Sequence, residues 1–304
     1  MKKFVSLTKR NCLVFLRDRA AVFFSLLAMF IVLMLMGVFL GNMNEENLLY
    51  LLEEYGGVRD ANLDAEHARE LVQYWTLAGI LVVNALTVTL SVIGNRVTDI
   101  SEGKLASFYS APVSRNVIAL SYVASAVLIG IFMCLLTLAV VLCYIVATGG
   151  EMLGIGALGK VFALIVLNVC IFSVIMYLLA LFIKSSSAWS GIATVAGTLV
   201  GFVGAIYLPM GFLPEGVAAV LKCIPVLHGT SLMREACCEE AINTTFAGLP
   251  AQVVSEYKEY MGIQIKIGEG LASPAFRILF LAGCGIIAFI IIAIVQKRRT
   301  ISDR

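Results

Sequence analysis

Residues 75–95 read WTLAGILVVNALTVTLSVIGN, a stretch without Asp, Glu, Lys, Arg or His. About 20 consecutive apolar residues are enough for a helix to cross a hydrocarbon core about 30 Å thick. The stretch lacks the strict alternation of apolar and polar residues that the strands of a membrane barrel need. It therefore predicts a transmembrane helix.

Five further stretches of this kind follow the same pattern, at residues 20–44, 116–150, 161–183, 185–214 and 278–296. From them we expect an all-α integral membrane protein, with residues 1–304 forming one transmembrane domain. Its six membrane helices are expected at residues 20–43, 75–95, 117–147, 161–183, 188–210 and 276–296. An interfacial helix over 1–19, a loop over 96–116 and two extracellular segments over 44–74 and 211–273 complete the prediction.

The composition supports a membrane protein. Hydrophobic residues make up 60% of the chain, charged residues 14%, and the mean hydropathy is +0.96. Soluble domains are about 45–50% apolar and about 25% charged. The net charge of +2 is too small to indicate a nucleic-acid partner, and no pair of the eight cysteines has the CxxC spacing of a metal site.

The distribution of Lys and Arg predicts the orientation. Most of them fall on one side of the predicted spans: Lys2, Lys3, Lys9, Arg10, Arg17, Arg19, Arg96, Lys104, Arg115, Lys184, Lys297, Arg298, Arg299 and Arg304. Since Lys and Arg favour the cytoplasmic side, both termini are expected in the cytoplasm of a multi-pass protein of the cell membrane. The first apolar stretch is longer than the core of a cleaved signal peptide, so we expect it to be retained.

The spans without ionisable groups bear on the energy source. Carriers coupled to protons or sodium usually bind the ion with buried charged groups, although backbone carbonyls at broken helices also bind sodium. Residues Gly154–Val161 have the GxxxxGK spacing of a phosphate loop, but Val161 replaces the Ser or Thr that holds magnesium. No preceding strand is predicted, so we interpret this segment as a turn, and an ATP-driven protein would need a partner ATPase.

The N-terminal segment Met1–Arg19 is imperfectly amphipathic. At 100° per residue, one face carries Lys2, Lys9, Arg10 and Arg17, and the other carries Phe4, Val5, Cys12, Phe15 and Leu16. Two interpretations remain open. The segment is either an interfacial helix whose basic face meets lipid or protein, or a basic flank that only sets the topology.

The loop after the second span contains EGKLASFYSAPVSR at residues 102–115. We expect Glu102-Gly103 to open a short helix that carries Leu105 and Phe108 one turn apart and that ends at Pro112. A short, half-apolar helix outside the membrane is expected to need a protein groove to cover it.

This loop resembles the pattern of ABC-type exporter permeases of the type-2 family. A second similarity follows the fifth span, in LPMGFLP at 208–214, IPVLH at 224–228 and LMR at 232–234. Span order, the amphipathic N-terminus and the basic C-terminus also fit, so the resemblance covers nearly the whole chain. The segments 44–74 and 235–273 are longer than the family pattern.

The resemblance implies a permease that pairs with a second copy or a homologous permease and with two cytoplasmic ABC ATPase subunits. ATP and magnesium would bind in those ATPases, with no cofactor, metal or catalytic residue in this chain. The residues implied to couple the permease to the ATPase are Glu102, Gly103, Leu105 and Phe108 of the loop, with Arg10 and Arg17 of the N-terminal helix.

Three further groups of residues are candidates for function. Asn84, Asn168 and Tyr207 are polar or aromatic residues within predicted spans, and they either line a substrate pathway or form hydrogen bonds between helices. A small residue recurs at every fourth position in Ala193, Gly197, Gly201 and Ala205, which suits a dimer seam or close packing within the bundle. Cys223 either pairs with Cys237 or Cys238 or stays a free thiol.

The function expected from these features is ATP-driven export by alternating access. Because the spans offer no counter-charge, we expect an amphipathic or lipid-like cargo such as a drug, an antibiotic, a peptide or a lipid-linked glycan. The alternatives are an ion-coupled carrier, a membrane enzyme acting on lipid, and a non-transporting scaffold or immunity protein. The sequence contains no HExxH motif, no GxSxG motif and no paired carboxylates beside a span, so no motif of this kind favours the enzyme.

Overall fold

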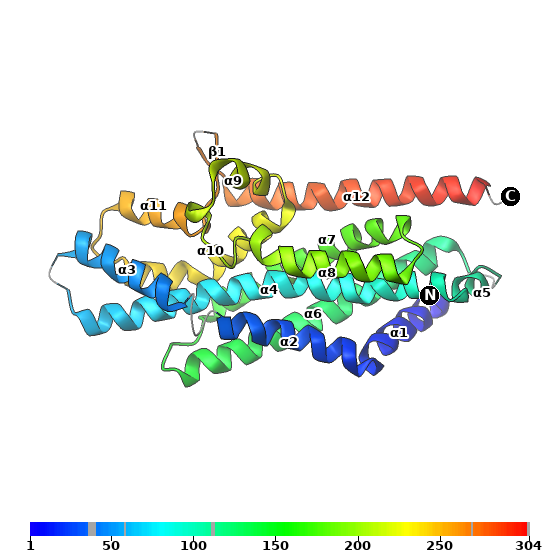
Figure 1. Ribbon diagram of the computed structural model, residues 1–304, viewed down its shortest axis with the longest axis horizontal. Coiled ribbons are helices and arrows are strands. Elements are labelled where there is room, and N and C mark those ends of the chain that lie inside the picture. The colour runs from blue at the N-terminus through cyan, green and yellow to red at the C-terminus, as the bar shows by residue number, and fades with distance from the viewer. Residues whose placement is uncertain (36–40, 58, 111–112, 269, 303–304) are drawn as a thin grey trace.

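The protein is an elongated helical bundle in a computed structural model that describes residues 1–35, 41–57, 59–110, 113–268 and 270–302 (Figure 1). The helices, in chain order, are α1 Lys2–Arg17, α2 Arg19–Leu35, α3 Gly41–Gly56, α4 Ala61–Ser101, α5 Lys104–Ser110, α6 Arg115–Ala147, α7 Ile155–Phe182, α8 Ser186–Val203, the 3-10 helix η2 Met210–Phe212, α9 Glu215–Leu221, α10 Pro225–Thr245, α11 Ala251–Tyr260 and α12 Pro274–Ser302. Within the described ranges, the strands are β1 Lys266–Ile267 and β2 Gly270–Leu271, which pair as an antiparallel hairpin. The chain is thus an all-α membrane protein, as its sequence predicts.

The central element of the bundle is α4, which packs against α6, α7, α8 and α10 and is almost wholly covered by them. Asp60 caps its N-terminus, accepting a hydrogen bond from the Asn62 backbone N–H at 2.9 Å. With 41 residues, the helix is roughly 60 Å long, about twice the thickness of a hydrocarbon core. The predicted span 75–95 is therefore the middle of a longer helix, which continues through residues expected in the flanking segments.

Five helices of the described chain are long and apolar enough to cross a membrane: α4, α6, α7, α8 and α12. They correspond to the second to sixth predicted spans. The first predicted span, 20–43, contains α2 and the start of α3, with residues 36–40 outside the described part. In addition, α9 and α10 meet at 88° and together have the composition of a broken or re-entrant span, so part of the segment 211–273 lies inside the bundle.

The fifth membrane helix differs from its prediction, because α8 ends at Val203 rather than at residue 210. Ala205 has a positive φ of 51°, and the N–H groups of Ile206 and Tyr207 both reach back to the carbonyl of Gly201. The chain therefore turns away from the helix axis within an apolar stretch that hydropathy does not divide.

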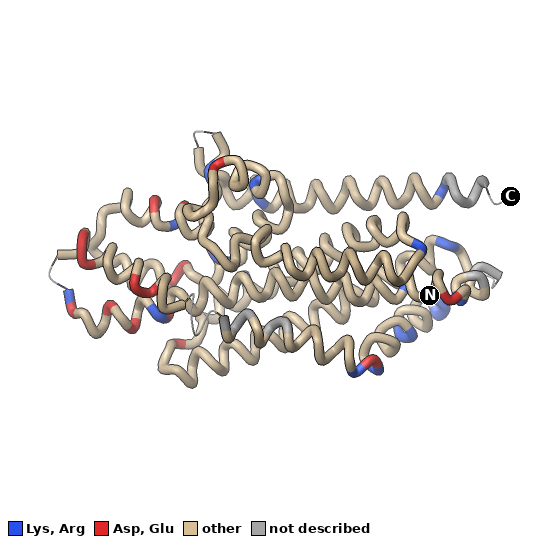
Figure 2. Tube along the Cα trace, viewed as in Figure 1, with Lys and Arg blue, Asp and Glu red and all other residues tan. Residues whose placement is uncertain are grey.

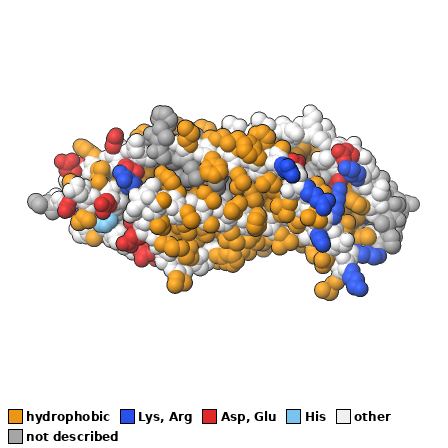
Figure 3. Space-filling model, turned by 90° about the horizontal axis from the view of Figure 1, so that it is seen from below, with side chains coloured by type: hydrophobic (Ala, Val, Ile, Leu, Met, Phe, Trp, Pro, Cys, Tyr) orange, Lys and Arg blue, Asp and Glu red, His pale blue; other side chains and the backbone are white. Residues whose placement is uncertain are grey.

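The two ends of the bundle carry opposite charges (Figure 2). We call the end with α5 the basic end and the end with α3 and α11 the acidic end. The elements near the basic end are α1, the start of α2, the end of α4, α5, the start of α6, the α7–α8 connection and the end of α12 (Figure 1). The described cations that these elements carry are Lys2, Lys3, Lys9, Arg10, Arg17, Arg19, Arg96, Lys104, Arg115, Lys184 and Lys297. A broad hydrophobic surface separates the two charged regions on the face shown in Figure 3, the pattern expected of a protein whose middle lies in a membrane.

Near the acidic end, two buried arginines join α10 to its neighbours. Arg234 stacks over Trp75 with its guanidinium carbon 4.0 Å from the ring centroid, and it donates hydrogen bonds to the carbonyls of Met261 and Ala205. Arg277 of α12 pairs with Glu235 and donates to the Ser231 hydroxyl at 2.7 Å. These contacts join α10 to α4, to the segment that follows α8 and to α12.

Candidate functional site at the basic end

Helix α1 packs against α6 and α4 at the basic end. Its buried residues are Thr8, Asn11 and Phe15, so the packed stripe is partly polar. Phe15 is buried as its place on the predicted apolar face suggests, whereas Val5 and Leu16 from that face are exposed. Hydropathy does not predict this stripe, because it contains the polar residues Thr8 and Asn11; the Asn11 amide has hydrogen-bond partners in Arg10 and Ser121 that replace water.

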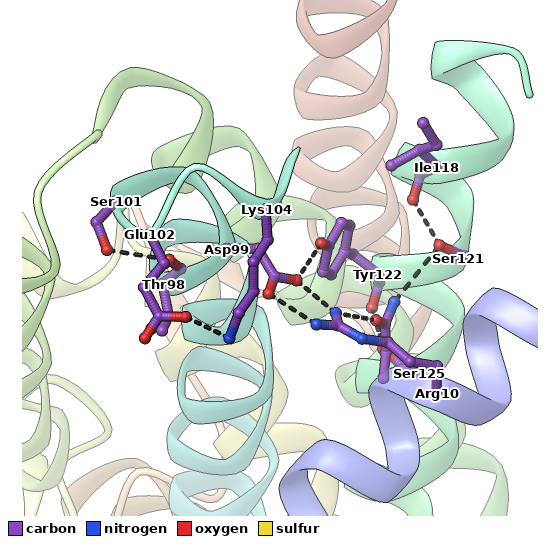
Figure 4. Close-up of polar contacts among 11 residues, drawn as sticks. Arg10, Thr98, Asp99, Ser101, Glu102, Lys104, Ile118, Ser121, Tyr122 and Ser125 are labelled. Carbon is purple, nitrogen blue, oxygen red and sulfur yellow. Dashed lines mark hydrogen bonds and ion pairs between the residues drawn. The ribbon is translucent and has the colours of Figure 1, made fainter. Parts of the chain in front are cut away.

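Helix α1 forms an ion pair with α4, between Arg10 and Asp99 (Figure 4). Both terminal nitrogens of Arg10 donate to the carboxylate, and the bond from Nη2 to Oδ1 measures 2.7 Å. Asp99 is only 3% exposed. A bidentate, charge-assisted pair of this kind fixes the relative orientation of the two elements that carry it.

Two hydrogen bonds extend this contact to α6. The Tyr122 hydroxyl donates to Asp99 Oδ2 at 2.5 Å. The Asn11 amide donates to the Ser121 hydroxyl at 3.4 Å, and Arg10 Nη1 donates to the Asn11 amide oxygen at 3.0 Å. The buried carboxylate thus has partners from α1 and α6, which compensate for its removal from water.

The short helix expected in the loop is present as α5, but it begins later than predicted. Glu102 is the C-terminal cap of α4, and Gly103 adopts a positive φ of 73°, so these two residues close α4 instead of opening α5. A left-handed φ is strained for any residue with a Cβ, which explains the glycine. Leu105 is buried, Glu102 is exposed and pairs with Lys104, and the predicted stop at Pro112 lies outside the described residues.

A single guanidinium joins α1, α4 and α5. Besides its pair with Asp99, Arg10 lies over the Phe108 ring of α5, 5.3 Å from the ring centroid. Its hydrogen bonds to Asp99 raise the pKa of Arg10 above its ordinary value, so the group stays charged at any physiological pH. Arg10 thus contacts α4 and α5 from its place on α1. We call Arg10, Asp99, Tyr122 and Phe108 the arginine junction.

The family resemblance implies Arg10 as a contact for an ATPase, and this stays a prediction; in the structure its guanidinium pairs with Asp99, and its side chain keeps 31% exposure. Arg17, the other predicted contact, is exposed at the end of α1. The sequence analysis missed Asp99 and Tyr122 altogether. The sequence does show Asp99 as an acid among many cations. Nothing in the sequence, however, relates Asp99 to Arg10, which lies almost ninety positions earlier.

One turn before Asp99, Arg96 fastens α4 to α7. It donates a hydrogen bond to the Ala180 carbonyl at 2.5 Å and lies 5.3 Å from the centroid of the Tyr177 ring. Arg96 is 4% exposed. The basic end is thus held together by the buried Arg96, which faces a carbonyl and an aromatic ring, and by the partly buried Arg10, which faces a carboxylate and an aromatic ring.

Asn84 and Asn168, predicted for a substrate pathway, both lie inside the helix packing. The Asn84 amide donates to the Thr137 hydroxyl of α6 at 2.6 Å. Asn168 donates to the Leu164 carbonyl of its own helix, and its buried amide oxygen closely approaches Gly229 of α10. The hydrogen bond of Asn84 to α6 agrees with the second of the two predicted roles, hydrogen bonding between helices.

Tyr207 and Ala205 lie beyond the end of α8, so the small-residue stripe on this helix ends at Gly201. A Cβ at Gly201 would meet the Tyr207 ring at 2.1 Å, and that ring packs edge-on against Phe202. Gly197 is exposed with open space around it, and Ala193 is half-buried. Gly201 therefore serves packing within the chain, while Gly197 faces outward.

Of the two alternatives predicted for Cys223, a disulfide or a free thiol, the structure has the free thiol. Cys237 and Cys238 are free thiols as well. Cys237 and Cys238 are buried in α10, whereas Cys223 is exposed after α9 and donates to the Ala219 carbonyl. Among the described residues, no group of His, Cys, Asp and Glu has the arrangement of a metal site.

A comparison with protein-family models matches residues 2–237 to the ABC-2 type transporter family. The chain belongs to this family. No curated protein matches it in a sequence search. An ABC-2 permease is a membrane subunit of a transporter and not an ATPase, and the matched range contains the whole arginine junction. It ends within α10, so α11, the hairpin and α12 lie outside the matched range.

Proposed function

We propose that this ABC-2 protein is the permease subunit of an ATP-driven exporter, energised by a separate cytoplasmic ATPase that docks on α5 and the exposed face of α1. The observation that carries the proposal is the arginine junction, together with the family match. A force applied to α5 or α1 has a direct route to α4, the helix that contacts most of the bundle.

In this proposal the basic end faces the cytoplasm, as the Lys and Arg distribution predicts. Nucleotide binding draws two ATPases together, and each displaces the α5 of its permease. Because Arg10 ties α5 and α1 to Asp99, α4 moves with them relative to its neighbours. Two permeases, either two copies or two homologues, then open toward the outside and release an amphipathic or lipid-like cargo.

The test uses the permease co-expressed and purified with its ATPase, reconstituted in lipid vesicles. In the double variant Glu102→Arg, Phe108→Ala, we expect loss of ATPase association or of transport-linked ATP hydrolysis. The matched control is Glu54→Arg, Tyr55→Ala in α3, where both residues are exposed at the acidic end. The control should retain association and hydrolysis.

Two results would oppose the proposal. Unchanged hydrolysis in the α5 variant would show that the ATPase docks elsewhere. Transport driven by a proton or sodium gradient, in a preparation that contains no ATPase, would exclude an ABC exporter.

A further inference from the structure

A cleft opens between α6, α7 and α12 in the half of the bundle nearest the basic end, with a volume of about 580 Å³. Its walls are apolar. They consist of Leu120 and Val123 of α6, Val174 of α7, and Phe289, Ile292 and Ala293 of α12. Since α6, α7 and α12 are membrane helices with exposed apolar side chains nearby, the cleft is bordered by the hydrocarbon of the bilayer.

The cleft is elongated along the helices. From Asn116 to Val123 on α6 the rise is about 10 Å, and from Phe289 to Lys297 on α12 it is about 12 Å. The rim residues that carry a side-chain amide or a charge are Asn116, Gln296 and Lys297. All three lie at one end of the cleft. A narrow apolar trough with a polar rim at one end matches the shape of a phospholipid better than that of a compact soluble molecule.

The charge at the rim favours an anion. Lys297 is exposed, and the lining includes no Asp or Glu. Arg115 immediately precedes Asn116. Two acids of the basic end are paired with cations, Asp99 with Arg10 and Glu102 with Lys104. Basic pockets between membrane helices on one leaflet bind the head groups of anionic lipids.

We infer that this cleft is a binding site for an anionic phospholipid of the leaflet at the basic end. One acyl chain lies between α6 and α12, and the phosphate contacts Lys297 and the Asn116 amide. The lipid is a bound structural ligand and not the cargo. The inference needs only that the protein lies in a membrane, and it is independent of the proposed export.

The floor of the cleft relates this site to the arginine junction. Tyr177 lines the cleft, accepts a hydrogen bond from Gln296 at 3.4 Å and lies beneath Arg96. Arg96 holds α4 against α7 one turn from Asp99. An acyl chain in the cleft would therefore support α7 and α12 where they border the residues that secure the basic end, and its binding should stabilise the fold.

The experiment measures lipid binding to the full chain, purified in a lipid-free detergent, by native mass spectrometry and by thermal unfolding. The probes are phosphatidylglycerol and phosphatidylcholine with identical acyl chains. We expect saturable binding and a raised Tm with phosphatidylglycerol, and at least fivefold weaker binding of phosphatidylcholine. Lys297→Gln should weaken phosphatidylglycerol binding about fivefold, since one basic residue near a headgroup contributes about 1 kcal/mol.

Matched controls separate a specific site from general charge and bulk. Lys184→Gln removes an exposed cation of the basic end that does not line the cleft, and it should bind like the unaltered chain. Ala293→Trp fills the cleft and should abolish binding, whereas Ile290→Trp adds an aromatic ring on an exposed part of α12 outside it. Because binding is measured directly, a variant with lowered Tm still gives a result.

Three outcomes would overturn the inference. They are equal binding of the two lipids, equal losses in Lys297→Gln and Lys184→Gln, or unchanged binding in Ala293→Trp.

Discussion

Asp99 is the residue on which the basic end depends, because its buried carboxylate is shared by Arg10 and Tyr122. In Asp99→Asn the ion pair is lost and an amide N–H₂ group replaces one acceptor beside a guanidinium. Breaking a buried pair by altering one partner typically costs about 3–5 kcal/mol, and the partial exposure of Arg10 lowers this to about 2–3 kcal/mol. Thermal unfolding in detergent should show the loss as a lowered Tm.

The matched control for Asp99→Asn is Glu102→Gln, which removes a carboxylate three residues away from an exposed pair with Lys104. Exposed ion pairs contribute about 0–1 kcal/mol, so its Tm should scarcely change. The double variant with Arg10→Gln should lose less than the sum of the two single losses, since both remove the same contact. Equal Tm changes in Asp99→Asn and Glu102→Gln would contradict the assignment of the junction.

At the scale of single helices, α8 packs against α4 at Gly94. A Cβ at this position would lie 2.6 Å from Nε1 of the Trp189 ring, which is buried. Gly94→Leu should therefore push α8 off α4 and destabilise the protein by about 1–3 kcal/mol. The measurement is Tm, compared with Gly191→Leu on α8, where the added side chain enters open space.

Trp189→Ala provides the internal check for the α4–α8 contact. Alone it should destabilise by leaving a cavity, but combined with Gly94→Leu it should restore part of the loss, because the new side chain occupies the vacated volume. Additive losses in the double variant would show that the two residues do not meet.

The sequence predicts these helices better than it predicts their ends. Absence of charge located the middle of α4, yet the helix continues through Arg96 and Asp99 because Ala180 and Arg10 provide their partners. Such partners come from distant parts of the chain, and a hydropathy pattern contains no information about them. The same limit applies to α8, whose end follows from the positive φ at Ala205 and not from any change in composition.

In the candidate site, too, features that depend on neighbouring residues could be predicted from the sequence, whereas contacts between distant parts of the chain could not. The presence of α5 follows from local sequence, and so does the exposure of Arg17. The arginine junction does not, because its members come from four helices. A resemblance to a family pattern located the loop, but only the packed chain shows that Arg10 points into the protein toward Asp99 (Figure 4).

At the scale of the whole molecule, α8 is the membrane helix least covered by the rest of the chain. Val195, Leu199 and Phe202 are exposed on it, and the space around Gly197 is open. Small residues let membrane helices approach closely, so this helix suits contact with the second permease of the proposed transporter. Gly197→Phe should then raise the dissociation constant of the permease pair at least tenfold, which corresponds to about 1.4 kcal/mol.

The pairing is measured in lipid bilayers by single-molecule photobleaching over a range of protein-to-lipid ratios. Gly283→Phe on α12 is the matched control, because a Cβ there also meets nothing within 4 Å and both positions lie on membrane helices. Since a Cβ meets nothing within 4 Å at either position, we expect the Tm of the isolated permease to stay unchanged in both variants. A pair fraction lowered equally by both would mean that added bulk acts generally, and one lowered only by Gly283→Phe would place the second permease on α12 instead.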